Sequence, residues 1–182
     1  MFAPDCYAMI ISNKKLTGRK TMQEFYFKYA EDGTYCVQSY EGDEAEVEIP
    51  AVYCGKPVTI LLDNLFAGHS EIISVTIPDT VTQIGGFVFD GCENLHQIKH
   101  PENLTDMWGY AFVRSGIEEI ELPEKVNSIV SFTFKDCKNL KRFICNKGLK
   151  KIYSWAFGGC DQLTDFQHGP DVEISPQAFE SK

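Results

Sequence analysis

EIISVTIPDTVTQIGGFVFDGCENL, residues 71–95, and IEEIELPEKVNSIVSFTFKDCKNL, residues 117–140, are two copies of one pattern. Each copy contains a short alternating segment, a proline, a second apolar segment, and a phenylalanine followed three residues later by a cysteine. Along the chain on both sides of these copies, a phenylalanine recurs every 22 or 23 residues. It stands at Phe66, Phe89, Phe112, Phe134, Phe157 and Phe179. The chain therefore contains an array of repeats.

Apolar side chains recur at fixed distances from this phenylalanine. Five residues before it stand Leu61, Ile84, Met107, Ile129, Ile152 and Ile174. Nine residues after it, or eight in one shortened unit, stand Val75, Ile98, Ile120, Phe143 and Phe166. A single coil cannot bury such a row, whereas coils stacked at the strand spacing of about 4.8 Å can. The sequence predicts a β-rich solenoid of stacked coils of 22 or 23 residues.

The corner of each coil and the ends of the array have their own signals. An alanine precedes the phenylalanine at Ala111, Ala156 and Ala178, which favours a short helical or 3₁₀ turn there. Residues 24–40 alternate around Asp32 and Gly33 and predict a β-hairpin that caps the array. We therefore divide the chain into a lead-in with a capping hairpin, residues 1–57, and a solenoid, residues 58–182, of about five full repeats and a truncated sixth.

The two quoted stretches resemble the BspA-like leucine-rich repeat, also described as the treponemal type. The resemblance covers about residues 58–179, and the preceding stretch 29–58 is similar to a lead-in common in that family. The resemblance implies a right-handed, leucine-rich-repeat-like solenoid. For characterised members it also implies bacterial surface proteins that act in adhesion or bind host proteins, so a host or matrix protein is the expected partner.

Composition excludes several partners. The net charge of −9 would repel a phosphate backbone, so no nucleic acid partner is expected. No apolar run approaches the roughly 20 residues of a membrane-spanning helix, so no membrane insertion is expected. The first 20 residues carry their positive charges after a short apolar stretch and do not read as a secretory signal. A cytoplasmic protein and a domain of a longer, exported chain both remain open.

Cysteines and histidines supply no catalytic, cofactor or metal constellation. Cys92, Cys137 and Cys160 each follow a repeat phenylalanine by three residues, which indicates small buried thiols, although Cys137 and Cys160 are neighbours that could pair. His96 and His100 lie on a predicted strand, where four residues span about 13 Å, too far to share an ion. Cys145 and His168 could be imagined as nucleophile and base, but no third group orients them. We therefore expect a chain that is not an enzyme.

An aromatic column is the candidate partner-binding site. Two residues before each phenylalanine stand Phe87, Tyr110, Phe132 and Trp155, and Trp108 and Tyr153 flank this column. The column is either a partly exposed platform for a protein or a glycan, or a stack of rings that shields the corner. The outward positions of the predicted strands, which are polar and of mixed charge, form a second candidate surface.

Three functions follow from these features: a protein-interaction module, a carbohydrate-binding module that uses the aromatic column, and an intracellular scaffold. The first is preferred.

Two features at the ends of the repeat array give further expectations. Asp43, Glu44, Glu46 and Glu48 either attract a divalent cation or a basic partner or form a solvated edge. No polar cap follows Phe179, so we expect further repeats, an oligomeric contact or a neighbouring domain to cover that end.

Overall fold

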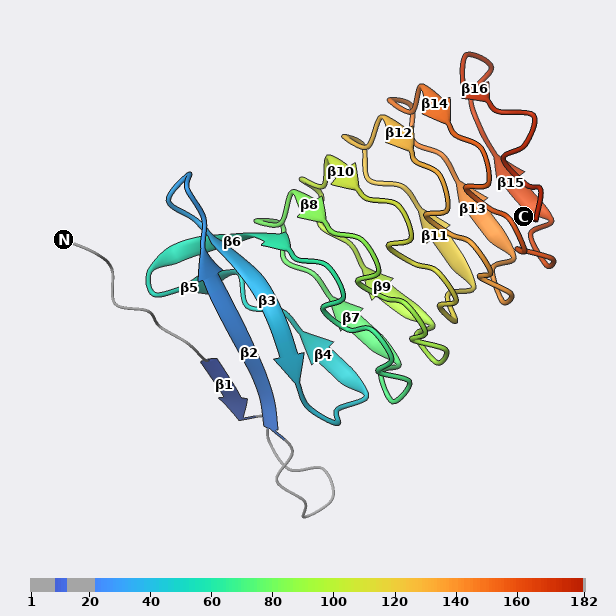
Figure 1. Ribbon diagram of the computed structural model, residues 1–182. Coiled ribbons are helices and arrows are strands. Elements are labelled where there is room, and N and C mark those ends of the chain that lie inside the picture. The colour runs from blue at the N-terminus through green and yellow to red at the C-terminus, as the bar shows by residue number, and fades with distance from the viewer. Residues whose placement is uncertain (1–8, 13–21, 182) are drawn as a thin grey trace.

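The computed structural model describes residues 9–12 and 22–181, and these residues form sixteen β-strands and no helix. Coils stack side by side along one axis, from the hairpin strands at the N-terminal end to β15 and β16 at the other (Figure 1). The predicted β-solenoid is confirmed. No helix in the described residues could cross a membrane.

The first strands form the predicted hairpin. β1 (Met9–Ser12), β2 (Met22–Tyr29) and β3 (Tyr35–Glu41) are antiparallel neighbours. β3 then pairs in parallel with β6 (Lys56–Leu61), which also takes β5 (Val52–Tyr53) as an antiparallel partner. This parallel pairing joins the hairpin to the first coil, so the apolar end of the solenoid is covered by the hairpin and not by solvent.

Two rows of short parallel strands run along opposite sides of the stack (Figure 1). The three-residue row contains β4 (Glu46–Glu48), β7 (Ser74–Thr76), β9 (Gln97–Lys99), β11 (Glu119–Glu121), β13 (Arg142–Ile144) and β15 (Asp165–Gln167). The two-residue row contains β8 (Gln83–Ile84), β10 (Asp106–Met107), β12 (Ser128–Ile129), β14 (Lys151–Ile152) and β16 (Glu173–Ile174). The predicted side-chain alternation holds along the three-residue row, since Val75 is buried between Ser74 and Thr76.

The repeat phenylalanines form the spine of the core. Successive rings from Phe66 to Phe157 stack with centroids 4.9 to 5.6 Å apart. These five rings are buried, because each is covered by the rings above and below it. Phe179 stacks on Phe157 at 5.5 Å but remains 46% exposed.

The corners that carry these phenylalanines are turns, which corrects the helical or 3₁₀ turn expected around Ala111, Ala156 and Ala178. The reason lies in the backbone. The residue two positions before Phe112 and the residue two positions after it, Tyr110 and Arg114, have φ of 64° and 55°. A helix cannot contain left-handed residues, so this corner is broken on both sides of its phenylalanine, as are the corners of Phe66, Phe89, Phe134 and Phe157.

One junction between coils differs from the others. β9 pairs with β7 and not with β11, and β10 pairs with β8 and not with β12, so both strand rows are interrupted between the same two coils. Figure 1 shows wider gaps at these places than between neighbouring strands elsewhere in the two rows. The corners remain joined, because Phe112 N–H donates to the Thr133 carbonyl at 2.9 Å. We call this opening the seam.

Candidate functional site

The four rings of the aromatic column stack face to face. Centroid distances are 4.8 Å for Phe87 and Tyr110, 4.8 Å for Tyr110 and Phe132, and 5.4 Å for Phe132 and Trp155, with interplanar angles of 7° to 11°. Neighbouring rings therefore cover one another's faces, and what the column presents to solvent is chiefly ring edges.

All four residues of the column have a left-handed backbone. Their φ angles are 58°, 64°, 66° and 60° in chain order, and Asn64 holds the same position in the preceding coil with φ 62°. Left-handed backbone costs about 1–2 kcal/mol for a residue with a side chain and is uncommon for bulky residues. Sequence reasoning found the column but missed this conformation, for which Asn64 was the available signal.

The two flanking aromatic residues are more exposed than the column. Trp108 is 63% and Tyr153 is 42% exposed. They are not brought together, because one coil lies between them and carries Val130 at the matching position. The Lys151 ammonium lies 5.2 Å from the Tyr153 ring centroid and covers one face of that ring. The six predicted residues thus form a closed stack with two separate exposed rings beside it.

The seam opens a groove in the three-residue row. The groove has a volume of about 550 Å³, and its lining includes His96, Lys99, His100, Glu119, Glu121 and Arg142. Arg142 lies 3.0 Å from Asp165 and 3.7 Å from Glu119, whereas Lys99 and Glu121 make no ion pair among residues 22–181. Burial lowers the pKa of His100, whose Nδ1 is buried without a hydrogen-bond partner. The one signal for this groove in the sequence was the residue missing between Phe112 and Ile117.

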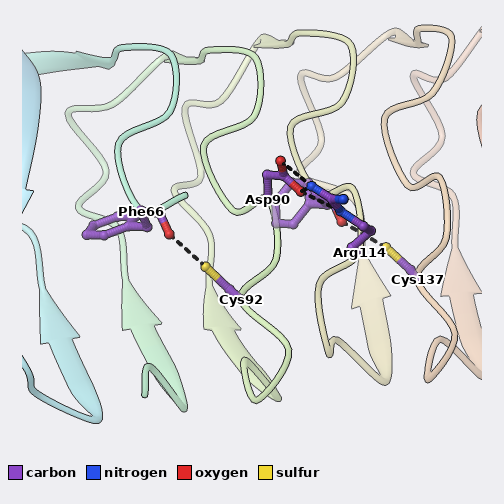
Figure 2. Close-up of polar contacts among 6 residues, drawn as sticks. Phe66, Asp90, Cys92, Arg114 and Cys137 are labelled. Carbon is purple, nitrogen blue, oxygen red and sulfur yellow. Dashed lines mark hydrogen bonds and ion pairs between the residues drawn. The ribbon is translucent and has the colours of Figure 1, made fainter. Parts of the chain in front are cut away.

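The repeat cysteines form hydrogen bonds between successive corners. Cys92 donates its thiol hydrogen to the Phe66 carbonyl at 3.1 Å, and Cys137 donates to the Phe112 carbonyl at 2.9 Å (Figure 2). Cys160 repeats this bond with the Phe134 carbonyl at 3.0 Å. Hydrogen bonding with Cys137 and burial raise the pKa of Cys160. Cys92, Cys137 and Cys160 form no disulfide, and each of these repeat thiols bonds to the backbone of the preceding coil.

The other groups considered for chemistry do not assemble. His168 Nδ1 lies 2.8 Å from the Gly169 carbonyl, and no hydrogen bond joins His168 to Cys145 in the described chain. Burial raises the pKa of Cys145 to about 11. Within residues 9–12 and 22–181, no group of three His, Cys, Asp or Glu side chains is placed to hold a metal ion. In the acidic lead-in, Gln23 donates to the Glu46 carbonyl at 2.7 Å and to Glu44 at 3.2 Å.

The family model for the BspA type leucine rich repeat region matches residues 59–182 in six copies. The chain belongs to this family. Repeats of the BspA type and leucine-rich repeats in general are associated with protein interaction, and proteins of this kind are generally non-enzymatic. No protein with a curated description matches the chain.

Solved structures of other leucine-rich repeat proteins share the fold. A Treponema pallidum leucine rich repeat protein is 23% identical, with TM-score 0.67 and 82% of each chain covered. A leucine-rich repeat protein from Bacteroides ovatus is 22% identical, with TM-score 0.61, over 86% of this chain and 49% of that one. A leucine rich cell surface protein from Faecalibacterium prausnitzii is 20% identical, with TM-score 0.57, over 86% and 54%. The chain spans about half the length of the latter two proteins.

The left-handed column predicts an unusual order of variant stabilities. Tyr110→Ala removes the stacked ring and keeps a Cβ at φ 64°, whereas Tyr110→Gly removes both. Glycine tolerates this φ, so the glycine variant should be the more stable of the two by about 1 kcal/mol, contrary to the usual preference for alanine. Urea unfolding of both variants measures the difference. An alanine variant as stable as the glycine variant would contradict a strained column.

The thiol bonds predict which cysteines react in the folded protein. Burial raises the pKa of Cys92 to about 12, so at pH 8 this thiol is neutral and unreactive. Iodoacetamide should therefore modify exposed Cys54 in native protein and reach Cys92 and Cys137 only after denaturation. Peptide mapping by mass spectrometry reads out both states. Equal alkylation rates for Cys92 and Cys54 would show that the corner opens.

Proposed function

We propose that this chain is a protein-interaction module of a bacterial surface protein, engaged in adhesion or in binding a host or matrix protein. The observation that carries the proposal is the pair of exposed aromatic side chains, Trp108 and Tyr153, beside the rigid stacked column. Exposed Trp and Tyr are enriched at protein interfaces and at their energetic centres. Because the column is already ordered, a partner that contacts it does not have to immobilise it.

The surface location is drawn from the family resemblance and from the description of the Faecalibacterium prausnitzii protein as a cell surface protein. The intracellular scaffold, the alternative without export, differs from this proposal only in location. Detection of the protein on intact cells by a protease that cannot enter them separates the two.

A carbohydrate-binding module is the second candidate, and the 63% exposed indole of Trp108 is the observation that favours it. Sugars pack against ring faces. The faces in the column are mostly covered by neighbouring rings, and Lys151 covers one face of Tyr153. The geometry therefore favours a protein partner over a glycan.

The function is tested by capture and then by substitution. Immobilised protein is exposed to purified matrix proteins, to a cell-envelope extract and to a glycan array. For a captured protein, Trp108→Ala combined with Tyr153→Ala should weaken binding at least tenfold, since truncating an interface centre costs about 2 kcal/mol or more. Tyr29→Ala, at a 46% exposed tyrosine of the hairpin, is the matched control. Glycan binding without protein binding would replace the proposal with its alternative.

We further propose that the end formed by β15 and β16 is covered by further repeats, a second copy or a neighbouring domain. Phe179 is 46% exposed there, and Phe166 and Ile174 are only partly buried. Where a second copy is the cover, light scattering of the isolated chain should show a concentration-dependent dimer, which Phe179→Asp dissolves. A strict monomer, together with undiminished stability when Phe179 is made polar, would contradict self-association at this end.

A further inference from the structure

The seam leaves backbone groups of two strands facing each other without pairing. Gln97 N–H donates to the Ile73 carbonyl and Ile77 N–H donates to the Lys99 carbonyl. The backbone polar groups of residues 97 and 99 therefore face β7. Successive residues of a strand direct their backbone N–H and C=O groups to opposite neighbours. The backbone groups of residues 98 and 100 therefore face β11. By the same argument, Arg142 N–H bonded to the Glu118 carbonyl places residues 119 and 121 toward β9.

Four amide groups thus point into the groove, those of Ile98, His100, Glu119 and Glu121. The equivalent amides of the other coils are bonded, as Ile77 N–H is to the Lys99 carbonyl at 2.9 Å. Across the seam, none of the four has a backbone acceptor within residues 22–181. Unpaired backbone donors are satisfied by water or by another chain, and paired strands flank this gap on both sides.

The gap between β9 and β11 is wider than the spacing of paired strands. Most Cα pairs between β9 and β11 are more than 8 Å apart, whereas most pairs between β7 and β9 are closer than that. A strand between two others needs them about 9.6 Å apart, twice the usual spacing of about 4.8 Å. β9 and β11 are therefore too far apart to bond each other, and the proposal requires the gap to reach this spacing when the added strand is bound.

The floor of the groove is apolar and incompletely covered. Ile98 is only partly buried, although Val75 and Phe143 at the same position of other coils are 1% and 0% exposed. Ile120 lies on the other side of the gap and is 6% exposed. An inward-pointing side chain of an added strand would cover Ile98, as the neighbouring coil does elsewhere.

We propose that this groove binds an extended segment of a protein partner, which adds as a strand between β9 and β11. The inference rests on the proposed function, because it supposes a protein ligand. Strand addition draws affinity from backbone hydrogen bonds and specificity from alternate side chains. Here the unpaired amides supply the backbone hydrogen bonds, and the partly covered Ile98 supplies an apolar contact that selects the side chain.

The lining defines the segment that fits. Its central residue points inward onto Ile98 and is apolar and branched. The residues before and after it point outward, one between Gln97 and Glu119 and one between Lys99 and Glu121. The position between Gln97 and Glu119 faces a carboxylate in a chain of net charge −9, so a basic side chain fits there and an acidic one does not. The position between Lys99 and Glu121 faces one cation and one carboxylate, neither of which has an ion pair among residues 22–181, so a hydroxyl side chain that can donate and accept fits there.

The first test needs no ligand. Hydrogen exchange followed by NMR should find the amides of Ile98, His100, Glu119 and Glu121 exchanging at least tenfold faster than their bonded equivalents at Val75, Ile77, Arg142 and Ile144. Similar protection in the two sets would mean that the seam is closed in solution, which overturns the inference and leaves the proposed function standing.

The second test adds a probe, the acetylated and amidated peptide Ser-Thr-Lys-Val-Thr-Ser. Titration should shift the four amide signals saturably and slow their exchange. N-methylation of the valine removes one backbone donor and should weaken binding at least tenfold, and replacing the lysine by glutamate should weaken it as well. Shifts confined to Trp108 and Tyr153, or equal binding of the N-methylated peptide, would overturn strand addition.

A third test closes the groove. An asparagine inserted after Gly116 restores the 23-residue spacing found at the other long units. In this variant the four amides should exchange slowly and the peptide should no longer bind. The Trp108 and Tyr153 signals should stay unchanged, which would report an intact fold. Retained peptide binding in a variant whose four amides are protected would refute the site.

Discussion

Hydrogen bonds between successive corners hold this solenoid together. The amide of each repeat phenylalanine donates to a carbonyl of the next coil at 2.8 to 2.9 Å, from Phe66 and Val88 to Phe157 and Ala178. The phenylalanine rings stack beside these bonds, so backbone pairing and apolar burial coincide in the same row. The bonds continue past the seam, where both strand rows are interrupted. The strand faces can therefore separate locally while the stack remains one body.

The period of the phenylalanine was sufficient to predict the solenoid, because a fixed period places equivalent side chains above one another. It predicted that Ile84 and Val75 face the core and that the cysteines belong to the corners. The capping hairpin was predicted separately, from the alternation around Asp32 and Gly33. It could not predict the conformation of the corner. The sign of φ at Tyr110 is set by how the turn closes over Phe112, and an aromatic side chain carries no signal for a left-handed backbone.

The sequence shows that one residue is missing between Phe112 and Ile117, but it did not predict that the strand rows open at this junction. The shortened corner is drawn against the preceding coil, where Gly116 N–H donates to the Cys92 carbonyl at 3.0 Å. A Cβ on Gly116 would lie 2.0 Å from the Glu93 carbonyl oxygen, so only glycine permits this approach. Arg114 and Asp90 add a two-pronged ion pair between the same corners, at 2.7 Å (Figure 2). The shortened corner thus keeps its bonds to the neighbouring coils, while both strand rows are interrupted at the same junction.

The aromatic column is not required by the backbone that carries it. Asparagine or glycine would adopt the left-handed conformation at lower cost, as Asn64 does one coil earlier. A stacked ring pair contributes about 0.5–1.5 kcal/mol, which is comparable with the strain of about 1–2 kcal/mol at each residue. Three stacked pairs alone offset only part of the strain at four residues, and the apolar area that the rings bury adds to the stacking in opposing that strain. What the column does supply is a row of rings packed face to face, next to exposed Trp108. Rigid aromatic surface loses little entropy when a partner binds, which is an advantage in recognition and none in folding.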